Sequence, residues 1–264
     1  MKIGHYPRRS PIVDLAAFVL LVAALTWFTG VGTSNLGYNW QWYRVPQYIL
    51  THEDGRWLAG PLIEGLLVTF EITGASLALA FAFGLISALC RLSDSYLARI
   101  VARGYLELIR NTPLLVQLFF MYFVIAPIFD LSRFASAVLA LSLFEGAYAS
   151  EIFRAGIVSI HKGQWEAAQS LGLSPFHTYR RVILPQAIRR ILPPLTSQAV
   201  SLVKDSALVS TIAVYDLTMR GREIISETFL AFEIWFTIAA IYLVVTVSLS
   251  LVASRMERRF GGAG

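Results

Sequence analysis

The sequence predicts an all-α integral membrane protein with six transmembrane helices. Hydrophobic residues make up 56% of the 264 residues, and the mean hydropathy is +0.61, which is more apolar than a soluble domain of this size. Six apolar runs are each long enough, at about 18 residues or more, to cross roughly 30 Å of hydrocarbon. They occupy residues 12–31, 62–90, 105–129, 134–155, 190–213 and 233–254.

The first apolar run follows three basic residues, Lys2, Arg8 and Arg9, as a secretory signal would. Because the run is long and no Ala-x-Ala cleavage site closes it, we expect a helix that is retained. Residues 32–61 are rich in Trp, Tyr, Gly and Asn, as expected for an extracytoplasmic loop with aromatic anchors at the membrane interface. We therefore expect two parts, a helix with its loop over 1–61 and a transmembrane domain over 62–264.

Prolines shape the third and fifth runs. Thr112 and Pro113 form an N-cap and N1 pair, so the continuous helix of the third span is expected to begin there, after a cytoplasmic approach helix over 94–111. Pro193 and Pro194 are expected to bend or begin the fifth span, because proline removes a backbone donor and clashes with the preceding turn. A bend would supply a hinge, and an ordinary helix start at the interface explains the same residues equally well.

The basic residues are distributed unequally between the two sides of the membrane. With the N-terminus in the cytoplasm, sixteen Lys and Arg residues fall on that side and five on the other. The positive-inside rule therefore places both termini and the loop over 156–189 in the cytoplasm. Because the basic residues cluster beside apolar runs, the net charge of +5 indicates topology and not a nucleic-acid surface.

The loop over 156–189 contains a predicted helix, turn and helix. Residues 161–170 favour a helix that Gly172 can end in a left-handed conformation. Ser174 and Pro175 are an N-cap and N1 pair that begins a second helix, which should run toward Pro185. Helices shorter than about 12 residues are marginal in water, so the pair needs a surface. That surface is either a partner protein or the lipid interface, where Arg180 and Arg181 would meet anionic headgroups.

Four motifs resemble the permease subunits of binding-protein-dependent ABC importers, over about residues 60–260. The loop carries Glu166-Ala167-Ala168, then Gly172, then Val182-x-Leu184-Pro185, which resembles the coupling loop of that family, with Val182 where isoleucine is usual. Three further stretches resemble the polar amino-acid branch of the family, namely ELIRNTPLLVQ over 107–117, AYASEIFRAG over 147–156 and KDSALVS over 204–210. Four motifs in order make a specific signal, whereas one alone would be weak.

This resemblance implies a multi-pass permease of the bacterial cytoplasmic membrane that imports polar amino acids. It implies an N-terminal extra helix before a five-helix core of the type I ABC importer kind over 62–264. The implied partners are a dimer of ATP-binding subunits that holds ATP and Mg, an extracytoplasmic solute-binding protein, and a second permease, identical or homologous. The contact with the ATPase falls on Glu166, Ala167, Ala168, Leu171, Gly172 and Ser174.

Charged and polar residues within the spans are costly and should face a partner or a water-filled cavity. Glu71 and Glu145 are candidates to meet the ammonium of an amino acid. Ser201, Lys204 and Asp205 continue a polar stripe from Ser197 at steps of three and four residues, which fits a pathway lining or a seam between helices. Glu151 and Arg154, at i and i+3, are expected to form a structural pair.

Several other chemistries have no support in the sequence. It has no phosphate-binding G-x-x-x-x-G-K-[ST] loop, no H-E-x-x-H pair and no nucleophile elbow, and its four histidines are scattered. We therefore expect no catalytic residue, metal site or cofactor on this chain, and we expect the single cysteine, Cys90, to be a buried apolar residue. The rival hypothesis is a secondary transporter or channel with Lys204, Asp205 and Glu71 as an ion relay, but no inverted repeat of hydropathy supports it.

Overall fold

The computed structural model describes residues 11–35, 37–53 and 55–261, and the chain divides into two compact units between Trp42 and Tyr43. The first unit contains α1 (Pro11–Asn35), an apolar helix long enough to cross a membrane and the first of the expected spans. Lys2, Arg8 and Arg9, on which the placement of the N-terminus depends, lie outside the described residues.

A small β-hairpin precedes the second span and departs from the all-α expectation. After the short helix α2 (Pro46–Ile49), strands β1 (Leu50–Glu53) and β2 (Arg56–Ala59) pair antiparallel, with His52 opposite Trp57. The turn between them contains Gly55 at φ +73°, a left-handed conformation that glycine adopts without strain. The Asp-Gly pair at 54–55 is the signal for such a turn.

Helices α3 (Pro61–Leu92) and α7 (Arg133–Val158) pack closely along their length and confirm the second and fourth expected spans. Small residues permit the approach. A Cβ on Gly84 would lie 2.7 Å from the Cβ of Ala149, and the Ser150 hydroxyl donates to the Ser87 hydroxyl at 3.1 Å. Small side chains and hydroxyl groups at helix interfaces are typical of membrane proteins, because they let backbones come close.

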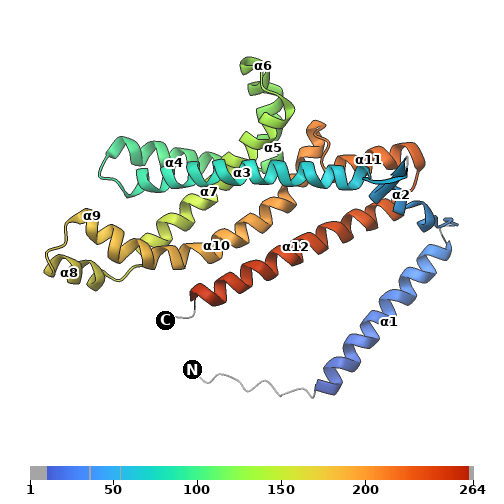
Figure 1. The fold of residues 1–264 in the computed structure, drawn as a ribbon, viewed down its shortest axis with the longest axis horizontal. Coiled ribbons are helices and arrows are strands. Elements are labelled where there is room, and N and C mark those ends of the chain that lie inside the picture. Colours follow the sequence, from blue (N-terminus) through green and yellow to red (C-terminus); the bar gives the residue numbers. More distant parts are fainter. Residues whose placement is uncertain (1–10, 36, 54, 262–264) are drawn as a thin grey trace. The chain divides into compact units, whose positions relative to one another are not determined.

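The third expected span, 105–129, is not one helix. Helix α4 (Tyr96–Arg110) runs beside α3 and α7 (Figure 1), as the approach helix was predicted to end near residue 111. The chain then bends by 106° into α5 (Leu114–Phe120) and α6 (Ala126–Phe129). Pro113 is the N-cap of α5, one residue later than predicted, because the Thr112 hydroxyl donates back to the Leu108 carbonyl at 2.9 Å.

The loop that follows α7 forms the predicted helical hairpin. Helix α8 (Lys162–Ser170) ends before Gly172, which has φ +69°, and α9 (Pro175–Thr178) begins after Ser174, whose hydroxyl accepts from the backbone N–H of His177. The second helix does not stop near Pro185, however. It continues through a π-helical segment (Tyr179–Ile183) into α10 (Leu184–Asp205), so the hairpin and the fifth span share one continuous helix.

Two π-helical segments each end two residues before a proline. Met121–Ile125 precedes Pro127, and Tyr179–Ile183 precedes Pro185. A proline ring clashes with the carbonyl four residues earlier, and a widened turn relieves this crowding without ending the helix. Pro193 and Pro194 lie inside α10, so they do not start a helix, and the alternative expectation of a bend at these prolines stays a prediction.

The last part of the chain forms two helices, and the second of them packs against α10. After α10, a 3₁₀ segment (Ser206–Ile212) leads to α11 (Leu217–Thr228) and then to α12 (Ala231–Gly261), which packs against α10. Within the described part of the chain, four helices are long and apolar enough to cross a membrane, or five if the bent pair over 96–129 counts as one span. The fifth expected span, 190–213, is divided between α10 and the 3₁₀ segment, and the count of six spans remains a prediction.

Candidate functional site

A cavity of about 250 Å³ lies between α3, α7 and α10. Its walls are mostly apolar, with Leu77 and Phe81 from α3 and Leu192 and Leu195 from α10. Glu145, on α7, is the one ionisable group among the lining residues. A mostly apolar pocket with one convergent charge is the usual form of a small-molecule site.

Glu145 is 2% exposed, and its two carboxylate oxygens differ. The Gln198 side-chain amide donates a hydrogen bond to Oε2, whereas Oε1 has no hydrogen-bond partner among the described residues. A buried, half-satisfied carboxylate costs free energy unless a cation or donor completes it. The ammonium group of an amino acid has the charge and the donors to do so.

Gln198 was not among the residues predicted from the sequence. Its amide is a polar group within an apolar span, three residues before Ser201 in the predicted polar stripe, and that was a usable signal. The pairing of Gln198 with Glu145, 53 residues earlier in the chain, could not be predicted from the sequence.

The other predicted pathway residues are not brought into this cavity. Glu71 is exposed on α3, Ser201 is half-buried and Lys204 is exposed. Asp205 is half-buried beside Lys204, and its carboxylate is close enough to Glu145 for the two negative charges to repel each other. The structure thus relates Asp205 to Glu145 and leaves Glu71 on a separate surface.

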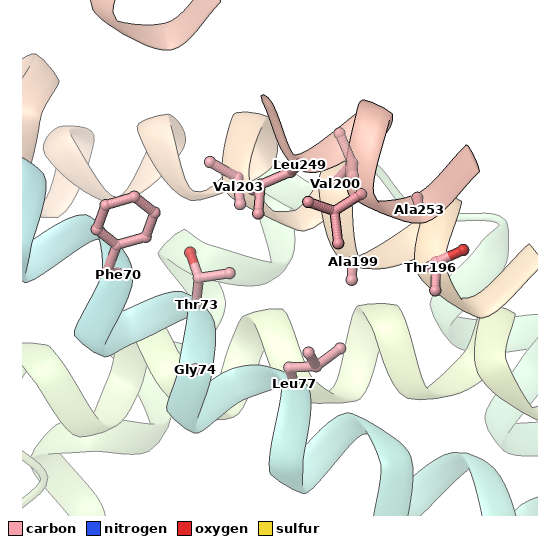
Figure 2. A pocket seen from close by; sticks show the side chains of 11 residues that line it. Phe70, Thr73, Gly74, Leu77, Thr196, Ala199, Val200, Val203, Leu249 and Ala253 are labelled. Atoms are coloured by element: carbon pink, nitrogen blue, oxygen red, sulfur yellow. The ribbon is translucent and has the colours of Figure 1, made fainter. Parts of the chain in front are cut away.

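A second cavity, of about 310 Å³, lies between α3, α10 and α12 (Figure 2). Its lining includes Phe70, Leu77 and Val203, and its polar side chains are Thr73 and Thr196. Both hydroxyls donate to carbonyls of their own helices at 2.7 Å. Since no ionisable group lines it, this cavity fits an apolar group and not a zwitterion.

The helical hairpin of α8 and α9 presents most of the predicted coupling residues at its surface. Glu166, Ala167, Leu171, Gly172 and Ser174 are exposed, and Leu171 is 79% exposed. Ala168, in contrast, is 2% exposed and packs inside the hairpin. Gly172 and the residue after it donate to the carbonyls of Gln169 and Ala168, the Schellman arrangement that ends α8.

Aromatic and polar contacts fix α8 to the helix that follows it. The rings of Trp165 and Tyr179 meet edge to face, with centroids 4.9 Å apart. The Gln186 amide donates to the Gln164 side-chain carbonyl at 3.2 Å, and Ile183 is fully buried beneath. Because Tyr179 and Gln186 belong to the helix that becomes α10, the hairpin is attached directly to the fifth span.

Glu151 lies at the centre of an ion-pair cluster near the C-terminal ends of α3, α4 and α7. The predicted pair with Arg154 is present at 3.5 Å, and it is joined by Arg91 of α3 at 2.6 Å and Arg110 of α4 at 3.4 Å.

Among the residues that the structure describes, no group of three or more His, Cys, Asp or Glu side chains could hold a metal ion.

These features define a polytopic helical permease with a helical hairpin between α7 and α10. The chain belongs to the family described as the binding-protein-dependent transport system inner membrane component, whose profile matches residues 80–262. It is a permease subunit of an amino acid ABC importer and a multi-pass component of the inner membrane.

Curated relatives support this assignment. The chain is 42% identical over 207 residues to the glutamine transport system permease protein GlnP of Escherichia coli (strain K12), an alignment that covers 77% of this chain and 94% of the relative. It is 43% identical over 201 residues to the L-cystine transport system permease protein TcyB of Bacillus subtilis (strain 168), covering 75% of this chain and 86% of the relative.

Solved structures agree. A structure titled as an amino acid ABC transporter with histidines matches with a TM-score of 0.71 and 41% identity, over 75% of this chain and 94% of that chain. An inward-facing MetNI methionine ABC transporter matches with a TM-score of 0.66 at 18% identity, which shows the fold alone.

Proposed function

We propose that this chain forms the membrane pathway of an importer for polar amino acids, with Glu145 as the group that receives the substrate ammonium. The buried Oε1 of Glu145, which has no partner in the described structure, carries the proposal. The relatives named for glutamine and L-cystine, and the structure titled with histidines, support amino acids as the substrate class. Ser201, Lys204, Asp205 and Glu71 would line other parts of the pathway.

ATP and Mg belong, in this proposal, to a dimer of ATP-binding subunits that contacts the hairpin from the cytoplasm. The exposed Glu166, Ala167, Leu171, Gly172 and Ser174 form the contact, and Ala168 supports it from inside. An extracytoplasmic solute-binding protein delivers the amino acid, and a second permease, identical or homologous, completes the pathway. Both termini lie in the cytoplasm, and residues 62–264 form the core with 1–61 as an addition.

Continuity of the helix offers a mechanism for coupling. The segment that begins after Ser174 runs through the π-helical turn into α10 and carries Gln198. A displacement of the hairpin by the ATPase is therefore passed along one helix to the partner of Glu145, which is held on α7. Movement of Gln198 relative to Glu145 would alter the cavity as the pathway alternates between its two openings.

The experiment is uptake into proteoliposomes that contain the permease with its ATPase and binding protein. We expect Glu145→Gln, which keeps the shape and removes the charge, to lower uptake by about tenfold or more, as losing a charge-assisted hydrogen bond does. Glu227→Gln, at an exposed position on α11, is the matched control. Wild-type uptake by Glu145→Gln would contradict the role of this carboxylate, and uptake that follows an ion gradient without the ATPase would favour a secondary transporter.

A further inference from the structure

A second cleft, of about 410 Å³, lies between α7 and α10 on the cytoplasmic side of the Glu145 cavity. Glu151, Ile152 and Ala155 of α7 line it with Ser159 at the C-cap of that helix, together with Arg190 and Pro194 of α10. Glu151 is six residues beyond Glu145 on α7, or about 9 Å at 1.5 Å per residue. Arg190 is eight residues before Gln198 on α10, or about 12 Å.

Glu151 is displaced from Glu145, and Arg190 from Gln198, in the same direction along the helix pair. Helix α7 runs into the hairpin at its end and α10 runs out of the hairpin at its start, so Glu151 and Arg190 are both on the hairpin side of the Glu145 cavity. The cavity and the cleft therefore occupy the same interhelical groove, one nearer the middle of the membrane and one nearer the cytoplasm.

The cleft is lined by one charged group of each sign, Glu151 and Arg190. Arg91, Arg110 and Arg154 all contact the Glu151 carboxylate, so the arginines more than balance it. Arg190 donates one hydrogen bond to the backbone carbonyl of Ser159, which fixes its guanidinium across the cleft. A guanidinium has five N–H donors, so others stay available for a carboxylate.

We propose that this cleft is a second amino-acid subsite, which receives the α-carboxylate of the substrate at Arg190 as it leaves toward the cytoplasm. The proposal rests on the proposed function, because it takes the Glu145 cavity as the preceding station. Arg190 and Glu151 are partly open to water, so the attraction is modest. Modest affinity suits an exit subsite, which must bind strongly enough to accept the substrate and weakly enough to release it.

Thiol protection tests occupancy directly, without relying on transport. In the complete transporter, Cys90→Ala removes the single cysteine, and Ala155→Cys places a thiol in the cleft. The complex is held in nanodiscs of phosphatidylcholine without nucleotide. Alkylation by N-ethylmaleimide is timed with and without L-glutamine or L-histidine, whichever the same purified complex imports in proteoliposomes. We expect the amino acid to slow alkylation several-fold.

Matched variants make the result specific. Arg190→Gln should abolish the protection and Arg190→Lys should restore part of it, whereas Arg189→Gln, an exposed neighbour outside the cleft, should leave it unchanged. A thiol at Val158→Cys, exposed on the same helix but outside the cleft, should not be protected. With Glu145→Gln added, uptake should fall by about tenfold or more while protection at the cleft persists, which separates the two sites.

Three outcomes would overturn the subsite. Equal alkylation with and without an amino acid that the preparation imports would show that the cleft does not bind it. Protection produced by phosphatidylglycerol alone, with no further effect of the amino acid, would assign the cleft to a lipid headgroup. Failure to import either amino acid would reject the proposed substrates, and the subsite with them.

Discussion

Trp165 and Tyr179 meet edge to face, with ring centroids 4.9 Å apart and planes at 83°. One ring belongs to α8 and the other to the π-helical segment that leads into α10. This contact closes the open side of the hairpin, so a force applied to α8 reaches the fifth span through packed side chains as well as through the turn at Gly172.

Loss of this aromatic contact should loosen the hairpin. Trp165→Ala removes an aromatic pair worth about 0.5–1.5 kcal/mol beyond its buried area, and we expect ATP hydrolysis to lose part of its dependence on substrate and binding protein. Trp165→Phe, which keeps an aromatic ring, should keep most of this dependence. ATPase activity in proteoliposomes measures this, with Trp57→Ala on the exposed strand β2 as a control. Full coupling in Trp165→Ala would refute the prediction.

Gly172 should tolerate only residues that accept a left-handed backbone. Nothing lies within 4 Å of a Cβ added there, so strain at φ +69° and not crowding limits substitution. Gly172→Val should cost about 1–2 kcal/mol at the turn and reduce transport-linked ATPase activity, while membrane insertion stays normal. Gly172→Asn should be milder, because Asn visits this conformation. Unchanged coupled activity in the Val variant would remove Gly172 from the coupling role.

Two glycines in neighbouring helices should respond oppositely to alanine. A Cβ on Gly84 would lie 2.7 Å from Ala149 and 3.0 Å from the Gly146 carbonyl, whereas one on Gly104 would meet nothing within 4 Å. Gly84→Ala should destabilise by about 1–3 kcal/mol through overpacking, and Gly104→Ala should stabilise by about 0.5–1 kcal/mol. Thermal unfolding followed by labelling of Cys90 measures both, and shifts of equal sign would contradict the packing argument.

Asp216 should make stability depend on pH. It is fully buried at the start of α11, where it accepts from the Met219 backbone N–H at 2.9 Å. Burial raises its pKa from the ordinary 3.8 to about 6, against the opposing effect of hydrogen bonds from Met219 and Thr218. The folded state thus holds the proton more tightly, so this stabilisation is complete below pH 3.8 and is lost as the pH rises through about 6.

Asp216→Asn keeps a capping oxygen and removes the titration. We expect the difference in unfolding midpoint between wild type and variant to change across the interval from 3.8 to about 6 and to be level outside it. Scanning fluorimetry at a series of pH values measures this difference. Parallel profiles would assign the pH dependence to other groups.

Local signals predicted the parts of the fold that depend on neighbouring residues. Apolar length located α1, α3, α7 and α12, and cap chemistry at Gly172 and Ser174 located the hairpin. Contacts between distant residues could not be predicted in this way. The pairing of Glu145 with Gln198, and of Glu151 with Arg91 and Arg110, depends on how the helices pack.

Strands β1 and β2, and the helix that continues past Pro185, show a second limit of prediction from sequence. The Asp-Gly turn signal at 54–55 was present, but the aromatic composition around it favoured an interfacial loop. At Pro185, a rule for straight α-helices predicted an end, whereas the widened turn over Tyr179–Ile183 lets the helix continue. Backbone adjustment of this kind depends on the energy of the whole packed helix, which local propensity does not contain.

That widened turn also sets the rotational phase of everything after it. A π-helical turn amounts to one extra residue in an α-helix, and each residue turns the helix by about 100°. If the same five residues of Tyr179–Ile183 closed into ordinary α-helical geometry, Arg190 and Gln198 would therefore rotate together by about 100° relative to α7. The alignment of Arg190 and Gln198 with α7 thus depends on the geometry of a five-residue segment that contains neither residue.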